Sequence, residues 1–271
     1  MYKKWNKWIC VIFAFLFTCC TPANMQTEKD AQWTDEQGLR YQKAEKADEY
    51  FIVGLTETYF EEIIVPSSFK EKPVTKIKEG AFYQKDKLKS VIISEGVSTI
   101  EKSAFSNSEN LVKIELPNTI EQIGYSAFEG CVSLNYIESQ GVYYLGNKQN
   151  AFLYLEKAEK DILSCNVEKG CRLVAAYAFM DCNELARVTL PNGVISIGRQ
   201  AFDRCRALEK VLLPSSLKQI DSFAFAECET LVELNFEGDS SEWETIEKIW
   251  DWRYDCRLKR IVCLDKTVYI N

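Results

Sequence analysis

The chain of 271 residues is predicted to fold as a β-rich solenoid, an array of stacked 23-residue coils with capped ends. First, the dipeptide Ala-Phe recurs in one phase at six positions, whose successive phenylalanines are 23, 23, 51, 23 and 23 positions apart. Second, an aliphatic residue stands four positions before each of these alanines. Third, apolar residues at relative positions 0, 3 and 5 follow each Ala-Phe pair. Units this short cannot bury their apolar faces alone, so neighbouring coils must stack around one continuous core. The phenylalanines are Phe82, Phe105, Phe128, Phe179, Phe202 and Phe225.

Each set at positions 0, 3 and 5 is predicted to form a strand. Its last two members, such as Val91 and Ile93 after Leu88, alternate with polar residues, which is the period of a half-buried strand. The set that begins at Leu134 is incomplete, with Ile137 as its one further member. Because all the sets share one phase, we expect nine strand positions in register within one elongated domain. They begin at Phe60, Leu88, Leu111, Leu134, Ile162, Leu185, Leu208, Leu231 and Leu258.

The repeats are assigned to residues 76–236, with a degenerate unit at 141–167 that lacks an Ala-Phe pair in this phase. The end coils of a solenoid must hide their open faces, so atypical ends are expected. Residues 38–75 are predicted to be the N-terminal cap, with short strands near its start. Residues 237–271 are predicted to be the C-terminal cap.

Residues 1–18 are predicted to be a lipoprotein-type secretory signal. Three lysines precede an uncharged apolar run of ten residues, which is too short to span about 30 Å of hydrocarbon. The sequence around Thr18 and Cys19 resembles the bacterial lipoprotein motif, so Cys19, or alternatively Cys20, is the expected lipid attachment site. A buried N-terminal helix is the alternative. Residues 19–37 are polar and lack an apolar period, so we expect a flexible tether that leaves an exported chain anchored to a membrane.

The composition excludes several classes of function. The chain has 33 Lys and Arg against 40 Asp and Glu, a net charge of −7, which argues against a nucleic-acid partner. It contains no histidine, which removes the commonest general base and every His-ligated metal site. There is no phosphate-binding glycine motif. We therefore expect neither a metal nor another cofactor, and no catalysis. An exported hydrolase with a carboxylate pair is the alternative.

Four cysteines occupy one repeat position, three residues after the phenylalanine. We expect a column of buried thiols that hydrogen-bond weakly to the turn backbone. Disulfides are the alternative, with Cys165–Cys171 and Cys256–Cys263 as better candidates than the column. The column consists of Cys131, Cys182, Cys205 and Cys228.

Tryptophans gather near the C-terminus. Trp243, Ile246 and Trp250 recur at helical spacing, so we expect one helix face that covers the last coil. A platform that stacks against sugars is the alternative interpretation.

The repeat, written I-x-x-x-A-F-x-x-C-x-x-L-x-x-V-x-L-P, resembles the BspA-type leucine-rich repeat family over roughly residues 38–268. The resemblance implies a right-handed, curved leucine-rich-repeat solenoid that is displayed on a cell surface or secreted, often in bacteria, and that binds proteins or mediates adhesion. The chain departs from the pattern in unit 141–167 and in having Lys85 and Ser108 in place of cysteine. Further matching segments are 38–41, 72–75 and 143–147, with Trp243, Ile246, Trp250, Cys263 and Asp265 near the end.

The concave side of the predicted solenoid is the expected binding surface, because solenoids use their concave faces in this way. We placed there the outward-facing residues of the strands, and we expect a protein or glycoprotein partner, such as a host or matrix component. A solvated sheet face without a partner and a structural role in an envelope assembly are the alternatives. The expected contact residues are Lys113, Glu115, Tyr136, Glu138, Arg187, Thr189, Lys210 and Leu212.

Overall fold

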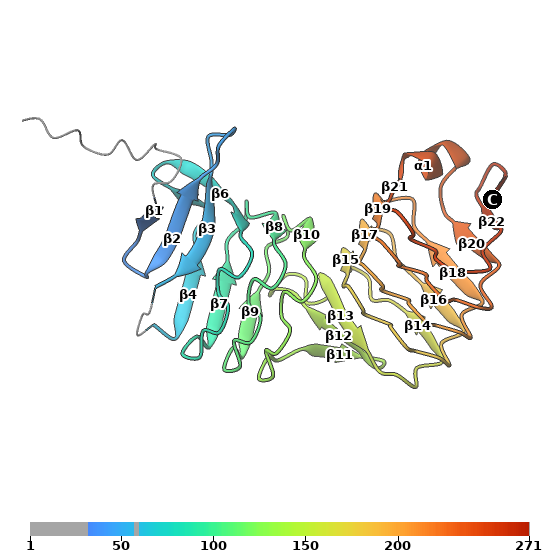
Figure 1. Ribbon diagram of the computed structural model, residues 1–271, viewed down its shortest axis with the longest axis horizontal. Helices are drawn as coiled ribbons and strands as arrows, with labels where there is room; N and C mark the ends of the chain where they lie inside the picture. Colours follow the sequence, from blue (N-terminus) through green and yellow to red (C-terminus); the bar gives the residue numbers. More distant parts are fainter. Residues whose placement is uncertain (1–31, 57–59, 271) are drawn as a thin grey trace, which may run out of the picture.

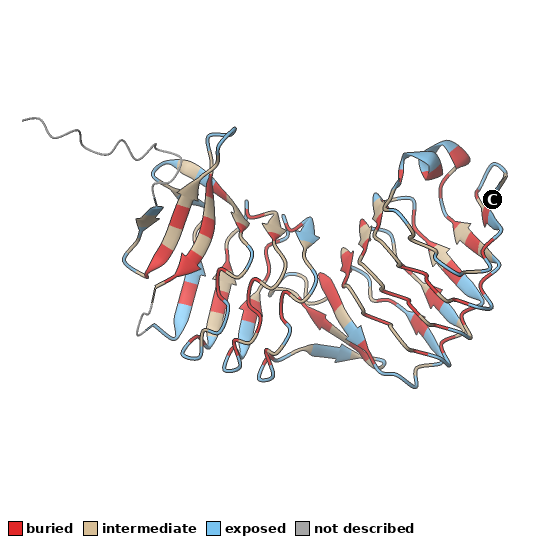
Figure 2. Ribbon diagram, in the orientation of Figure 1, coloured by how far each residue is buried: buried red, intermediate tan, exposed pale blue. Residues whose placement is uncertain are grey.

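The computed structural model describes residues 32–56 and 60–270. Figure 1 shows an arch made of two stacks of coils. The N-terminal arm comprises residues 32–135 and the C-terminal arm residues 159–270, and a hairpin unit at 136–158 joins them at the bottom of the arch. Buried residues line the inside of the coils in both arms (Figure 2). The predicted β-solenoid is confirmed.

Parallel strands cover the outer side of the arch (Figure 1). Their inward residues are buried at the predicted positions, as Val91 and Ile93 show, and Cys165 lies in register with Val188. The first sheet contains β4 (Glu62–Val65), β7 (Ser90–Ile93) and β9 (Lys113–Glu115). The second contains β14 (Ser164–Asn166), β16 (Arg187–Thr189), β18 (Lys210–Leu213), β20 (Glu233–Phe236), β22 (Arg260–Val262) and antiparallel β23 (Thr267–Tyr269).

Short strands line the inner side, facing the gap between the arms (Figure 1). All of them except β21 carry the aliphatic residue that precedes Ala-Phe, and Ile77, Ile100, Ile197 and Ile220 are fully buried there. The N-terminal arm contributes β6 (Lys72–Ile77), β8 (Thr99–Ile100) and β10 (Gln122–Ile123). The C-terminal arm contributes β15 (Leu173–Val174), β17 (Ser196–Ile197), β19 (Gln219–Ile220) and β21 (Glu247–Lys248).

The Ala-Phe turns stack into columns. Phe82 and Phe105 lie parallel with 4.7 Å between ring centroids, and Phe202 lies between Phe179 and Phe225 at 4.9 and 5.1 Å. Each turn bends sharply at two residues with positive φ, for example 53° at Ser103. The alanine has to be small because the turn lies directly against its neighbour.

The four cysteines of the repeat form the expected buried column. The thiols of Cys131, Cys205 and Cys228 donate to phenylalanine carbonyls of the preceding coil at 3.0 to 3.2 Å. Burial raises the pKa of the Cys131 thiol to about 11. Ser108 takes the same position in its coil, where its hydroxyl donates to Phe82 O at 2.6 Å. All eight cysteines among the described residues are free thiols, the two suggested disulfide pairs included.

The fourth predicted strand leaves the outer sheet. Ile137 was expected to point inward but is 47% exposed, because its strand pairs antiparallel with the next one instead of with β9. Gln140 and Gly141 both have positive φ, as a two-residue hairpin turn of type I′ requires. The local hairpin therefore overrides the 23-residue register. Its strands are β11 (Ile137–Ser139), β12 (Val142–Leu145) and β13 (Tyr154–Ala158).

The N-terminal cap contains the strands predicted near its start. Residues 32–34, which we assigned to the tether, instead form a strand whose Trp33 packs against the core. The rest of the predicted tether before residue 32, the signal segment, Cys19 and Cys20 lie outside the described residues. The cap strands are β1 (Gln32–Thr34), β2 (Leu39–Lys43), β3 (Tyr50–Leu55) and β5 (Ser68–Phe69).

The C-terminal cap has one short helix, α1 (Ser240–Thr245), with Asp239 and Glu242 in a capping box. Trp243 is buried as expected, but Trp250 is 79% exposed. The predicted helix therefore extends too far along the chain, because the observed helix ends at Thr245. The chain turns extended at Ile246 so that β21 can pair with β19, and Trp252 packs against the core in place of Trp250.

Candidate protein-interaction surface

The predicted contact residues form columns only within each outer sheet. Lys113 aligns with Ser90 in the first sheet, and Arg187 aligns with Lys210 in the second. Arg187 and Lys210 are exposed, as is Lys113, whereas Thr189, Leu212 and Glu115 are half-buried. Lys113 Nζ lies 2.7 Å from Glu115 Oε1. The expected alignment is therefore correct inside each arm.

These columns lie on the outer side of the arch, so their placement on the concave side was wrong (Figure 1). The hairpin unit occupies the outer side beside β9, where Leu116 N–H donates to Gly146 O at 3.0 Å. On the inner side, Arg172 Nε donates to Ile120 O at 2.7 Å and ties the two arms together. The inserted hairpin separates the outer sheets while Arg172 holds the inner strands close, so the arch closes toward the inner strands.

Tyr136 and Glu138, the predicted centre of the surface, do not continue either column. Tyr136 packs against the core, with its ring 6.3 Å from that of Tyr143 and the ammonium of Lys157 above it. Burial, and then the nearby carboxyl of Glu156, raise the pKa of the Tyr136 hydroxyl. Glu138 is exposed and accepts a hydrogen bond from Gly141 N–H. The predicted continuous patch is thus divided between two separate sheets.

A cleft of about 430 Å³ lies on the true concave side, and both arms line it. Its walls come from the inner strands themselves and from the positions just after them, which are equivalent places in successive coils. These positions were not among the predicted contact residues, because the longer, alternating strands were expected on the concave side. Residues that line it include Glu101, Lys102, Tyr125, Leu173, Arg199 and Asp221.

Fixed ion pairs surround the N-terminal half of this cleft. Glu101 Oε1 lies 2.9 Å from Lys78 Nζ and 3.7 Å from Lys76 Nζ, and Lys102 Nζ lies 3.1 Å from a Glu79 oxygen. Burial disfavours the charge on Glu101, but the hydrogen bonds from Lys78 and from the Glu79 N–H outweigh it and lower the pKa of the carboxyl. The cleft therefore presents both signs of charge on an ordered backbone.

Aromatic and guanidinium groups supply possible anchors in the same cleft. Tyr125 is 40% exposed, and Arg199 from the opposite arm stacks 5.9 Å from the ring of Phe223. Tyr and Arg are the residue types that most often contribute strongly to protein interfaces. Their presence on two arms means that one ligand could contact both.

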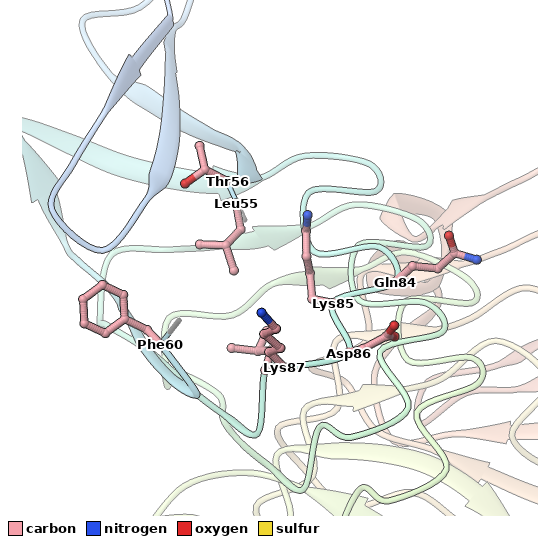
Figure 3. Close-up of a pocket in the computed structure, with 8 residues that line it drawn as sticks. Leu55, Thr56, Phe60, Gln84, Lys85, Asp86 and Lys87 are labelled. Atoms are coloured by element: carbon pink, nitrogen blue, oxygen red, sulfur yellow. The ribbon is translucent and has the colours of Figure 1, made fainter. Parts of the chain in front are cut away.

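A smaller cavity of about 250 Å³ lies between the N-terminal cap and the first Ala-Phe coil (Figure 3). Leu55 and Phe60 line one side, and Lys85, Asp86 and Lys87 line the other.

Within residues 32–56 and 60–270, no group of three potential ligands is arranged to hold a metal ion. None of the helices in this part of the chain is long and apolar enough to cross a membrane.

The chain is similar to several solved leucine-rich repeat structures. The leucine-rich repeat protein of T. pallidum is 25% identical, over 80% of this chain and 85% of its own, with a TM-score of 0.44. A leucine-rich cell surface protein from Faecalibacterium prausnitzii is 18% identical over 86% and 76%, with a TM-score of 0.43. The pneumococcal vaccine antigen PcpA is 15% identical over 88% and 82%, with a TM-score of 0.42.

No curated protein matches the sequence. A family model does: the BspA type leucine rich repeat region matches in six copies, over residues 75–171 and 148–271. These matches cover more than half of the chain and coincide with the repeats described above. The chain belongs to the BspA type leucine-rich repeat family.

Proposed function

We propose that this protein is a non-catalytic interaction module that binds a polypeptide partner in its concave cleft. The observation that carries the proposal is a 430 Å³ cleft lined by equivalent positions of successive coils from both arms. It combines an exposed tyrosine, an arginine and both signs of charge, which suits a protein better than a phosphate polymer.

Display outside the cell is part of the same proposal. The cationic and apolar N-terminus supports export, and one of the similar structures is a leucine-rich cell surface protein. Attachment of lipid to Cys19 or Cys20 would hold the chain on a membrane. Replacing both cysteines with serine should move the protein from the membrane fraction to the aqueous fraction. A double variant that remains fully membrane-bound would refute the lipid anchor.

The binding site is tested by photo-crosslinking followed by affinity measurement. A photoreactive residue in place of Tyr125 should capture a partner on the native cell surface, and the same residue in place of Arg187 on the outer sheet should not. With the captured partner purified, the double change Tyr125→Ala, Arg199→Ala should weaken binding by about 30-fold if both are hot spots.

The matched control is Arg187→Ala, Lys210→Ala, which alters exposed residues of the outer columns. This control should bind normally, and both double variants should keep the thermal stability of the parent chain. If the control loses affinity while the cleft variant binds normally, the outer columns are the binding surface and the cleft assignment fails.

A further inference from the structure

The Ala-Phe turns are joined by a ladder of backbone hydrogen bonds. In the second turn, the N–H groups of Ser103, Phe105 and Asn107 donate to carbonyls of the third turn at 3.2, 2.8 and 2.7 Å. The turns of the C-terminal arm repeat this pattern up to the cap, where Phe225 N–H donates to Trp252 O at 2.8 Å. Alternate N–H groups of each turn are therefore paired with the next coil.

The third turn breaks this ladder. The equivalent N–H groups of Ser126, Phe128 and Gly130 make no hydrogen bond to any described residue. The next unit has no Ala-Phe turn at this place. Its segment from Leu155 to Ala158 advances three positions, whereas the equivalent segment of other coils, such as Val174 to Phe179, advances five. No carbonyl of this shortened segment reaches the third turn. We call this place the ladder gap (residues 126–130).

A cavity of about 460 Å³ opens at the ladder gap. Ser126, Ala127 and Glu129 line it on the N-terminal side, and Tyr154 and Glu156 line it on the other. Tyr154 takes the place of the missing phenylalanine, with its ring 6.0 Å from that of Phe128. The core is thus continuous beneath the gap, while the backbone N–H groups above it have no partner among the described residues.

Glu156 is the unusual side chain of this cavity. Its Oε2 is buried and has no hydrogen-bond partner, although the residue as a whole is only half-buried. Tyr154 lines the same cavity, and Lys157 follows Glu156 in the chain. The Lys157 ammonium, however, lies over the rings of Tyr136 and Tyr143, at 5.0 and 5.2 Å. A buried carboxylate without a cationic partner is costly, so it favours a ligand that brings a positive charge.

We propose that the ladder gap binds an extended polypeptide segment that carries a basic side chain. Donors on alternate residues match the two-residue repeat of an extended chain, whose alternate carbonyls would accept from Ser126, Phe128 and Gly130. The lysine or arginine of the segment pairs with Glu156, and Glu129 at the rim adds a second negative charge. This inference rests on the proposed function, because both assume a polypeptide partner, but it places the contact at the ladder gap instead of in the concave cleft.

The test is an amide NMR titration of the full chain labelled with ¹⁵N. The probes are a blocked heptapeptide of alternating valine and serine with a central lysine, the same peptide with a central glutamate, and sodium acetate. The lysine peptide should shift the amide resonances of Ser126, Phe128 and Gly130 and leave the paired Ser103 and Phe105 unchanged. Its affinity should exceed that of the glutamate peptide by about tenfold or more, and Glu156→Gln should remove that preference.

Three results would overturn the inference. They are no shift at the ladder gap with millimolar lysine peptide, equal affinity for the two peptides, and shifts with acetate equal to those with peptide, which would indicate a site for small carboxylates. Arg199→Ala, a change in the cleft away from the ladder gap, should leave the affinity for the lysine peptide unaltered. Peptide shifts confined to the cleft would refute the ladder-gap site and leave the proposed function standing. A captured partner that binds neither the cleft nor the gap would refute both.

Discussion

The C-terminal arm and the hairpin unit belong to one array and differ in how completely their coils pair. In the C-terminal arm, successive turns contact each other through stacked rings and hydrogen bonds, and Phe225 makes an edge-on ring contact and a hydrogen bond with Trp252 of the cap. In the hairpin unit, Tyr154 keeps an edge-on ring contact with Phe128, but no described residue accepts the equivalent hydrogen bonds. A solenoid can therefore keep a continuous core while its ladder of backbone hydrogen bonds is interrupted. The interruption leaves free the backbone N–H groups that in other turns bond to the next coil.

The largest expected effect concerns the stacked rings. Phe202→Ala removes a ring packed on both faces and should lower the free energy of unfolding by about 4 kcal/mol. Phe128→Ala should cost about 3 kcal/mol, because Tyr154 covers one side at 65° instead of stacking. Denaturant titration measures both. A cost below about 1 kcal/mol for either would contradict its placement in the core.

The pH dependence of stability should reveal Glu156. Burial raises the pKa of its carboxyl to about 7 from an ordinary value of 4.5, so the folded chain holds this proton more tightly than the unfolded chain. The contribution of Glu156 to the free energy of unfolding should therefore be complete below pH 4.5, decrease as the pH rises toward 7, and stay constant at higher pH. The loss should be at most about 3 kcal/mol.

Glu156→Gln is the control, because it cannot ionise and should remove this slope. The chain has no histidine, so no side chain with an ordinary pKa of about 6 to 7 interferes in this range. Carboxyls with lowered pKa values, such as Glu101, lose their contribution only at lower pH. An unchanged slope in the glutamine variant would show that Glu156 is not the group responsible.

Changes at the cysteine position of the repeat, which Ser108 occupies in its coil, should have a smaller effect on the free energy of unfolding. Ser108 accepts from Lys85 N–H at 3.0 Å and donates to Phe82 O, so Ser108→Ala leaves two backbone groups unpaired and should cost about 2 kcal/mol. Ser108→Cys should recover most of that loss, since Cys205 makes the same contact with Phe179 O. Thermal unfolding measures both variants, and equal losses would mean that hydrogen bonding is irrelevant at this position.

The smallest effect is expected at the junction of the arms. Arg172→Ala removes one part-buried hydrogen bond, to Ile120 O, so the cost should be about 1 kcal/mol. Glu121→Gln should change little, because its oxygen lies 3.9 Å from Arg172 and is well exposed. Small-angle scattering should show a wider arch in the Arg172 variant. An arch of unchanged width would mean that the hairpin unit alone holds the arms.

Much of the fold could be predicted from the sequence because each coil repeats the same apolar positions. The 23-residue phase of the repeat predicted the buried residues of eight strands and the cysteine column. It also predicted the strand around Cys165, inside the long interval between two Ala-Phe pairs. The direction of curvature could not be predicted, because it depends on where the hairpin inserts and on the contact between Arg172 and Ile120. The candidate surface was consequently assigned to the wrong side.

The ladder gap could not be predicted either. The absence of an in-phase Ala-Phe pair was visible in the sequence, but the unpaired N–H groups at Ser126 and Gly130 follow only from how the shortened segment crosses the next coil. Glu156 likewise looked like one acid among many until its burial beside Tyr154 was known. The exposure of Ile137 reflects a Gln-Gly turn, which is a weaker hairpin signal than Asn-Gly.

Amide hydrogen exchange in the free protein tests directly whether the backbone ladder is interrupted at the hairpin unit. Two turns of equal pattern are compared: Ser103, Phe105 and Asn107, whose N–H groups are paired, and Ser126, Phe128 and Gly130, whose N–H groups have no partner among the described residues. The second set should exchange about 100-fold faster, because only the first must break inter-coil bonds to exchange. Equal protection of the two sets would show that the ladder continues through the hairpin unit and that the proposed interruption does not exist.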